Sequence, residues 1–231
     1  MPNKIVHVDG IFLKGKISHF KASEYVNSCL EFRNSSSVLG SVEKDFHDPE
    51  MIEILEYSEK AISALAPGNQ TTVFHMELFA PKTKEENWAL LEVGARVGGA
   101  MIPYIWREVH KIDLMQIAWD VAIGSSTAGS SSKELVSKNQ AESEIGGWLL
   151  IQNPVAPPCV IEDIRSMTNQ ANGPYAEFLP QIGETIPAAH TFFEHIAARF
   201  RFRGISHHEV LEKLKFTARN FQIKATPALQ D

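Results

Sequence analysis

Short apolar segments separated by tight-turn signals open the sequence and constrain its fold most. Residues 5–8 and 11–13 are rich in β-branched and aromatic side chains, and Asp9-Gly10 lies between them. The triplet Lys14-Gly15-Lys16 then precedes a third such segment, residues 17–20. Two-residue turns of this kind join antiparallel strands, whereas parallel strands need long crossover connections. The sequence therefore predicts a small antiparallel meander at the start of the chain.

A second hairpin is predicted further along. Residues 71–79 alternate apolar with polar side chains, and residues 88–93 form another short apolar run after the charged loop 82–87. Alternation with a period of two is typical of strands that are buried on one face. Strands are also predicted at residues 147–151 and 158–164, with a final edge strand at 221–223.

Helices are predicted between these strands. Asp48, Pro49 and Glu50 fit the cap and first turn of a helix. Its predicted inward stripe consists of Met51, Ile52, Leu55, Ile62 and Leu65. Residues 102–123 predict two further helical pieces, in which Asp113 caps the second and Gly124 ends it. Ser206 and Glu209 form a capping box for a last helix, in which Val210, Leu211 and Leu214 face inward.

The fold class that follows is α+β, with a mostly antiparallel sheet and packed helices. We expect a first domain at residues 1–124, a Ser-rich linker or loop at 125–144, and a small α+β C-terminal domain at 145–231. The linker is predicted because its small polar residues bury too little apolar surface to order the segment.

Composition excludes several classes of protein. The 22 Lys and Arg residues against 28 Asp and Glu give a formal charge of −6, which disfavours binding to nucleic-acid phosphates. No apolar run approaches the roughly 18 residues of a membrane-spanning helix. The two cysteines, Cys29 and Cys159, cannot form a disulfide framework. Since the start also lacks the apolar core of a secretory signal, we expect a cytoplasmic protein.

The second hairpin carries a pair of glutamates. Alternation places His75, Glu77 and Phe79 on one face of its first strand, and pairing of the two strands brings Glu92 to that face, roughly 5 Å from Glu77. Two carboxylates this close repel each other unless a cation lies between them. A Mg²⁺ ion bound together with a nucleotide fits such a pair. The pattern fits equally well two glutamates that are solvated on an exposed face.

Arg96 and the pair Gly98-Gly99 favour the first interpretation. They follow the strand directly, so a guanidinium group and open backbone N–H groups would face a bound phosphate. A glycine pair alone is weak support, because most such pairs are turns.

The run from Val73 to Gly99, followed by Met101-Ile102-Pro103 and Ile112-Asp113-Leu114, resembles the C-terminal lobe of ATP-grasp enzymes. It is most similar to the branch of carboxylate–amine ligases that includes the L-amino-acid ligases. Residues from Gly147 through Ser206 are similar to the small C-terminal domain of those ligases.

The resemblance implies roles for particular residues. The His-x-Glu strand implies Glu77 as one metal ligand, and Glu-x-x-x-Arg-x-Gly-Gly implies Glu92 as the second. The arginine of that motif, Arg96, would stabilise an acyl phosphate. Gly98 and Gly99 would contact the cofactor, and Asp9 and His75 would lie on the substrate side. The implied cofactors are ATP and Mg²⁺ or Mn²⁺, and the implied substrates are a small carboxylate and an amine.

Two departures from the pattern accompany the resemblance. Gly94 occupies the position where many ATP-grasp enzymes have an asparagine metal ligand. The lobes that precede this region in the family, which grip the nucleotide, are not found in the sequence. We therefore expect a truncated ligase or a split one completed by a second chain, with a non-catalytic binding or structural module as the alternative. A third reading is an ordinary α+β domain whose glutamates lie on the surface.

Loss of a covering lobe has a structural consequence. If the missing lobe normally covers the meander, we expect Ile5, Ile11 and Phe12 to be partly exposed as an apolar patch.

Overall fold

The computed structural model of the chain describes residues 4–34, 38–66, 70–83, 85–125, 144–188 and 196–228. The chain groups into two compact units, Met1–Tyr25 with Glu43–Ile145, and Val26–Val42 with Gly146–Asp231. Most of the predicted Ser-rich linker, residues 126–143, lies outside the described residues. The division into domains at residues 1–124 and 145–231 stays a prediction.

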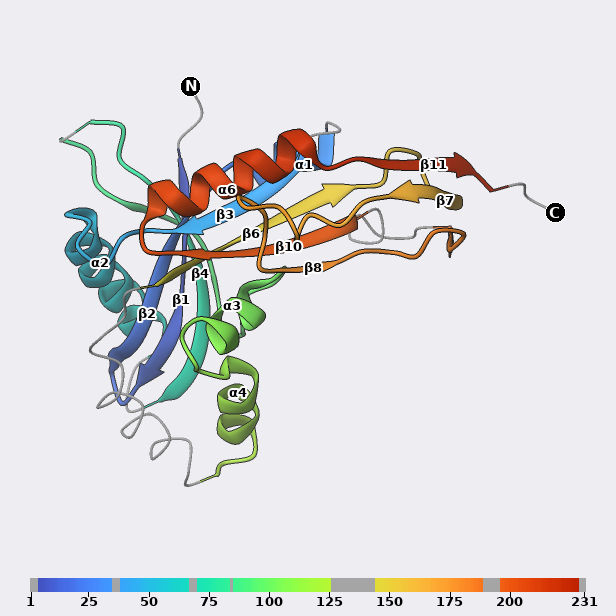
Figure 1. The fold of residues 1–231 in the computed structure, drawn as a ribbon. Helices are drawn as coiled ribbons and strands as arrows, with labels where there is room; N and C mark the ends of the chain where they lie inside the picture. The colour runs from blue at the N-terminus through green and yellow to red at the C-terminus, as the bar shows by residue number, and fades with distance from the viewer. Residues whose placement is uncertain are drawn as a thin grey trace. The chain divides into compact units, whose positions relative to one another are not determined.

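The first unit is an antiparallel sheet with helices, which confirms the α+β class (Figure 1). Its elements are β1 (Ile5–Leu13), β2 (Lys16–Tyr25), α2 (Glu50–Leu65), β4 (Thr71–Phe79), β5 (Ala89–Gly94), α3 (Ile102–Glu108) and α4 (Leu114–Ala122). The strands lie in the order β5-β4-β1-β2, and each neighbouring pair is antiparallel. The predicted meander and the predicted hairpin thus belong to one sheet.

β1 differs from its prediction at Asp9-Gly10, which is not a turn. The strand continues through both residues, and Gly10 pairs with Phe20 on one side and Phe74 on the other. A Cβ atom at Gly10 would lie less than 3 Å from the Phe74 ring, so glycine serves close packing here. The real turn is at Lys14 and Gly15, where both residues adopt positive φ values of 51° and 87°.

Helix α2 covers one face of this sheet. The Oδ1 atom of Asp48 accepts a hydrogen bond from the Glu50 N–H group at 2.8 Å, so the predicted helix start is confirmed. The buried side chains of the helix are Met51, Ile54, Ser58 and Ile62. The predicted stripe is wrong for Ile52 and Leu65, which are exposed. The inward face is centred on Ile54, at i, i+3 and i+4 spacing from its neighbours.

The apolar patch predicted at Ile5, Ile11 and Phe12 is wrong for Ile11 and Phe12. Phe12 is fully buried in the core that α2 shares with β1 and β4. Ile11 is buried as well, and Ile5 is half-buried. The unit's own helices therefore cover the apolar side chains of β1.

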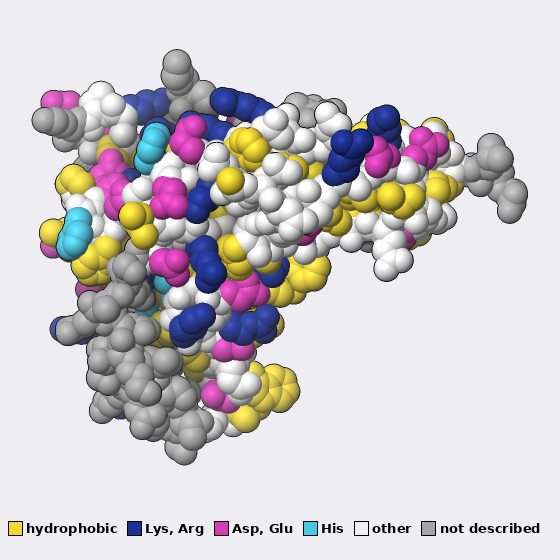
Figure 2. Space-filling model, viewed as in Figure 1, with side chains coloured by type: hydrophobic (Ala, Val, Ile, Leu, Met, Phe, Trp, Pro, Cys, Tyr) yellow, Lys and Arg dark blue, Asp and Glu magenta, His cyan; other side chains and the backbone are white. Residues whose placement is uncertain are grey.

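Helices α3 and α4 confirm the two predicted helical pieces. Asp113 caps α4 by accepting a hydrogen bond from the Gln116 N–H group at 3.0 Å, and Gly124 ends it with a φ of 67°. Three side chains one turn apart on this segment, Met115, Trp119 and Ile123, are exposed, and Figure 2 shows hydrophobic atoms at the surface where Figure 1 places α4. Among the described residues, no helix combines the length and apolarity needed to cross a membrane.

The second unit contains a run of four paired strands and a separate three-stranded sheet. Its elements are α1 (Cys29–Asn34), β3 (Val38–Glu43), β6 (Ile145–Gln152), β7 (Cys159–Ile164), β8 (Ala176–Phe178), β9 (Thr185–Ile186), β10 (Ile196–Gly204), α6 (His207–Asn220) and β11 (Ile223–Pro227). The run has the order β3-β6-β10-β8, and the three-stranded sheet has the order β11-β7-β9. The strands predicted near 147–151, 158–164 and 221–223 correspond to β6, β7 and β11, while β3 and β10 were not predicted.

Helix α6 packs on the strands of the run β3-β6-β10-β8. Ser206 caps it by accepting a hydrogen bond from the Glu209 N–H group at 3.2 Å, as predicted. Val210 and Leu214 are buried, whereas Leu211 is only half-buried. The helix contacts β10, and Figure 1 shows it lying along the sheet.

Candidate functional site

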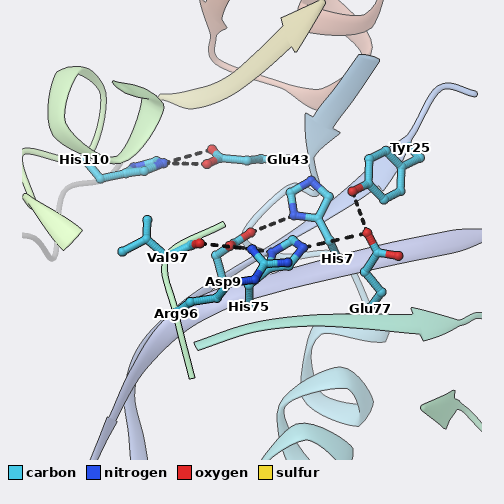
Figure 3. A network of polar contacts seen from close by, with 9 residues as sticks. All are labelled: His7, Asp9, Tyr25, Glu43, His75, Glu77, Arg96, Val97 and His110. Atoms are coloured by element: carbon cyan, nitrogen blue, oxygen red, sulfur yellow. Dashed lines mark hydrogen bonds and ion pairs between the residues drawn. The ribbon is translucent and has the colours of Figure 1, made fainter. Parts of the chain in front are cut away.

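The candidate site lies on the face of the first unit's sheet that is opposite α2. Strand alternation turns His7 and Asp9 of β1, and His75 and Glu77 of β4, to this face. The register sets His7 opposite Glu77, and Asp9 opposite His75. Four polar side chains therefore lie at adjacent positions on two neighbouring strands, as Figure 3 shows.

Strand β5 adds Glu92 to the same face. Glu92 is the direct register partner of Glu77, so the predicted convergence of the two glutamates is confirmed. The register shifts immediately beside this pair, where Leu78 pairs with Leu90 and leaves Leu91 as an extra residue. A β-bulge of this kind re-aims the side chains next to it and is common beside active sites.

The carboxylate of Asp9 holds two histidines in the buried part of the site. Its Oδ2 atom lies 2.7 Å from Nδ1 of His7, and its Oδ1 atom lies 2.8 Å from Nδ1 of His75. All three side chains are buried. Burial raises the pKa of Asp9, but the hydrogen bonds with His7 and His75 outweigh this and hold the pKa below its usual range. The carboxylate is therefore ionised at neutral pH.

His75 connects this buried network to Glu77. Its Nε2 atom lies 3.7 Å from Oε1 of Glu77. Burial lowers the pKa of His75, but the hydrogen bond with Asp9 and the nearby Glu77 carboxylate outweigh burial and raise the pKa to about 9. At neutral pH the ring therefore carries a positive charge between two carboxylates.

The carboxylate of Glu77 is oriented by Tyr25, whose hydroxyl donates a hydrogen bond to Oε1 at 2.7 Å. Burial raises the pKa of Glu77, but the nearby His75 ring and the hydrogen bond from Tyr25 outweigh burial, so that the pKa lies below its usual range. Glu77 is thus a fixed, ionised carboxylate at the boundary between the interior and solvent.

Glu92 and Arg96 form the exposed side of the site. The Nη2 atom of Arg96 lies 3.8 Å from Oε1 of Glu92, and its Nη1 atom donates a hydrogen bond to the carbonyl oxygen of Val97 at 3.1 Å. Their side chains are 59% and 53% exposed, so both are open to a ligand from solvent. The predicted proximity of Arg96 to the carboxylate pair is confirmed.

The two glycines after Arg96 differ in their surroundings. A Cβ atom at Gly98 would clash with the Asp9 carboxylate and would lie 2.9 Å from Nδ1 of His75. At Gly99 a Cβ atom would meet nothing within 4 Å. Gly98 therefore closes the buried network, while Gly99 borders open space. The predicted contact of both glycines with a cofactor stays a prediction.

No protein-family model matches the sequence, and the search of curated proteins finds no match. Solved structures do match. An L-amino acid ligase from Bacillus licheniformis aligns with a TM-score of 0.67 and 19% identity, over 96% of this chain and 54% of that one. A phosphoribosylglycinamide synthetase from Anaerococcus prevotii aligns with a TM-score of 0.66 and 13% identity, over 97% of this chain and 53% of that one.

A third match is the biotin carboxylase domain of a 2-oxoglutarate carboxylase from Hydrogenobacter thermophilus, in complex with MgADP, ADP and bicarbonate. It aligns with a TM-score of 0.56 and 12% identity, over 96% of this chain and 46% of that one. The chain has the fold of the C-terminal part of an ATP-grasp protein. It spans about half the length of each of these solved ATP-grasp chains.

The residues present fit a divalent cation such as the magnesium in the MgADP complex of the third match. One ligand atom each from His75, Glu77 and Glu92 lies within 4.8 Å of the others. Carboxylate oxygens are the donors that Mg²⁺ prefers. Glu77 and Glu92 are thus the residues that would hold the ion, and Arg96 lies on the exposed side of the pair.

Several residues of the site were missed as candidates from the sequence. His7 and Tyr25 each contact a predicted site residue. In the sequence, only their alternate positions along β1 and β2 could have indicated that they face the site. Glu43 and His110 form a separate buried pair, in which Nε2 of His110 lies 2.7 and 2.9 Å from the two carboxylate oxygens. Both residues belong to the first unit, where the pair joins Glu43 to the segment after α3, and no local pattern indicates it (Figure 3).

Proposed function

We propose that this chain supplies the metal-binding half of an ATP- and Mg²⁺-dependent carboxylate–amine ligase that forms an amide or peptide bond. One observation carries the proposal: Glu77 and Glu92 are direct register partners on a sheet of ATP-grasp fold, with Arg96 beside them. The structural likeness to an L-amino acid ligase supports the reaction class.

Each residue would contribute through its charge and position. In the proposed reaction a carboxylate would take the γ-phosphoryl group of ATP and release ADP, and an amine would then displace phosphate from the acyl phosphate. A bound Mg²⁺ ion supplies neutralisation of phosphate charge. Glu77, oriented by Tyr25, and Glu92 would hold that ion. The Arg96 guanidinium would stabilise the negative charge of the acyl phosphate, and the open backbone at Gly99 would let the substrate approach.

The chain spans about half of the solved ATP-grasp structures it matches. We therefore propose that nucleotide grip is completed by further polypeptide, in the same protein or in a second chain. The alternative is a non-catalytic binding module, and the exposure of Glu92 and Arg96 is the observation that favours it. The two functions differ in whether the glutamate pair contributes to nucleotide binding.

A calorimetric titration of Mg²⁺-ATP tests the proposal. We expect weak binding to the chain, weakened at least about tenfold by Glu77→Gln and by Glu92→Gln. Glu56→Gln, on the exposed side of α2, is the matched control and should bind like the wild type. Absence of binding at millimolar Mg²⁺-ATP, or binding that is indifferent to both site variants, would contradict the proposal. Release of ADP that requires both an added carboxylate and an added amine would establish the ligase reaction.

A further inference from the structure

The proposed carboxylate pair has a third donor beside it. Resting on the proposed function, we propose that Nε2 of His75 joins Glu77 and Glu92 in binding the cation. The ion would displace the proton that this nitrogen carries in the metal-free protein. The site would then have one nitrogen and two carboxylate donors, a set that favours a first-row transition ion over Mg²⁺. This assigns His75 to the metal rather than to the substrate side.

The distances fit a shared ion. Two donors that each lie about 2.1 Å from one ion can be no more than about 4.2 Å apart. Nε2 of His75 and Oε1 of Glu77 are 3.7 Å apart, which is too long for a direct hydrogen bond and within that limit. A carboxylate oxygen of Glu92 completes the group within 4.8 Å. Where this spacing exceeds about 4.2 Å, the Glu92 side chain, which is 59% exposed, would move toward the ion.

The buried network sets which nitrogen of His75 is directed to the site. Nδ1 is engaged by Asp9 at 2.8 Å, and Asp9 is in turn held by His7 at 2.7 Å. Histidines that ligate metals commonly bond a carboxylate through the other ring nitrogen, which fixes the tautomer and the ring orientation. Figure 3 shows the ring of His75 lying between Asp9 and Glu77. Asp9 and His7 would thus act as positioning residues for this ligand.

The third donor comes from β4 rather than from β5. The register partner of His75 is Gly94, which has no side chain to place over the site. The side chain of Arg96 lies against that position instead, with Cγ 3.2 Å from where a Cβ atom of Gly94 would be. Imidazole is a good ligand for transition ions, whereas Mg²⁺ retains oxygen ligands and water. This donor set therefore changes the selectivity of the site.

Electron paramagnetic resonance tests the inference, with Mn²⁺ added to the full chain after any other metal has been removed. Electron spin echo modulation reports nitrogen bound directly to Mn²⁺. We expect nitrogen modulation in the wild type and its loss in His75→Gln, where the amide can offer oxygen in place of nitrogen. His47→Gln, on the exposed loop before α2, is the matched control and should retain the signal. We also expect His75→Gln to weaken Mn²⁺ binding at least about tenfold and Mg²⁺ binding far less.

The outcomes separate this inference from the proposed function. If Mn²⁺ binds to the wild type through Glu77 and Glu92 but the spectrum shows no nitrogen modulation, His75 is not a ligand. The ligase proposal would then remain intact. Failure of Mn²⁺ to bind would overturn it too, while the Mg²⁺-ATP titration judges the ligase proposal independently. If His75→Gln does not fold, as judged by circular dichroism, the wild-type spectrum alone decides.

Discussion

Asp9 is the residue on which the buried part of the site depends. Its carboxylate bridges two imidazole rings, and all three side chains are withdrawn from solvent. An unpaired buried charge is strongly destabilising, whereas a charge with two hydrogen-bond partners can be accommodated. The ionised Asp9 and the protonated His75 therefore stabilise each other in the absence of a metal.

This coupling predicts a pH dependence of stability. The pKa of His75 is raised from its ordinary value of 6.5 to about 9, so the folded state holds a proton that the unfolded state loses. The stabilisation is fully present below pH 6.5 and disappears as the pH rises through 9. In chelator-treated protein we expect the free energy of unfolding to fall by up to about 3 kcal/mol over this interval.

Urea unfolding of the wild type and of His75→Gln at a series of pH values checks this. The difference between the two proteins should shrink as the solution becomes alkaline. A constant difference from neutral pH to pH 9.5 would show that His75 is not protonated in the folded state.

Gly98 offers a second prediction at the residue scale. Gly98→Ala places a methyl group against Asp9 and Ile102, in a buried position. Overpacking of this kind costs about 1–3 kcal/mol of stability. The adjacent Gly99→Ala meets no atom within 4 Å and should change stability by less than about 0.5 kcal/mol. Thermal melts of the two variants make the comparison, and equal melting temperatures would contradict the packing described for Gly98.

At the scale of elements, the sequence was most informative in strands whose apolar and polar residues alternate. The parity of Glu77 on β4 and of Glu92 on β5 sufficed to predict that the two side chains meet. The buried Asp9–His75 contact was not predicted, because it joins residues 66 apart through the β1–β4 register. A long-range register is set by the whole sheet, and no local pattern fixes it.

Two strands and one helix were missed or misread from the sequence pattern. β3 is buried along nearly all its length and so shows no alternation. In α2 the apolar residues extend beyond the buried face, and periodicity alone placed Ile52 and Leu65 inside. Asp9-Gly10 has the composition of a turn, but pairing on both sides keeps it in the middle of β1.

At the scale of the whole molecule, the two compact units interleave along the chain. Residues 26–42 belong with residues 146–231, because β3 pairs antiparallel with β6 from Val38↔Ile151 to Val42↔Gly147. The 103 residues from Glu43 to Ile145 belong to the other unit. Contacts between segments so distant in sequence leave no signal in composition or periodicity.

This interleaving predicts that residues 146–231 do not fold alone. Without β3, the backbone groups of β6 that face it lose their partners, and buried side chains such as Leu149 and Leu150 become more exposed. Val42 and Gly147 are register partners. A short Gly/Ser loop can therefore join residues 26–42 directly to residues 146–231, so that β3 and β6 form a hairpin. We expect that fusion to melt in one cooperative transition and the fragment 146–231 to show none. Circular dichroism melts of both proteins decide, and a cooperative melt of the fragment alone would instead support an independent C-terminal domain beginning near residue 145.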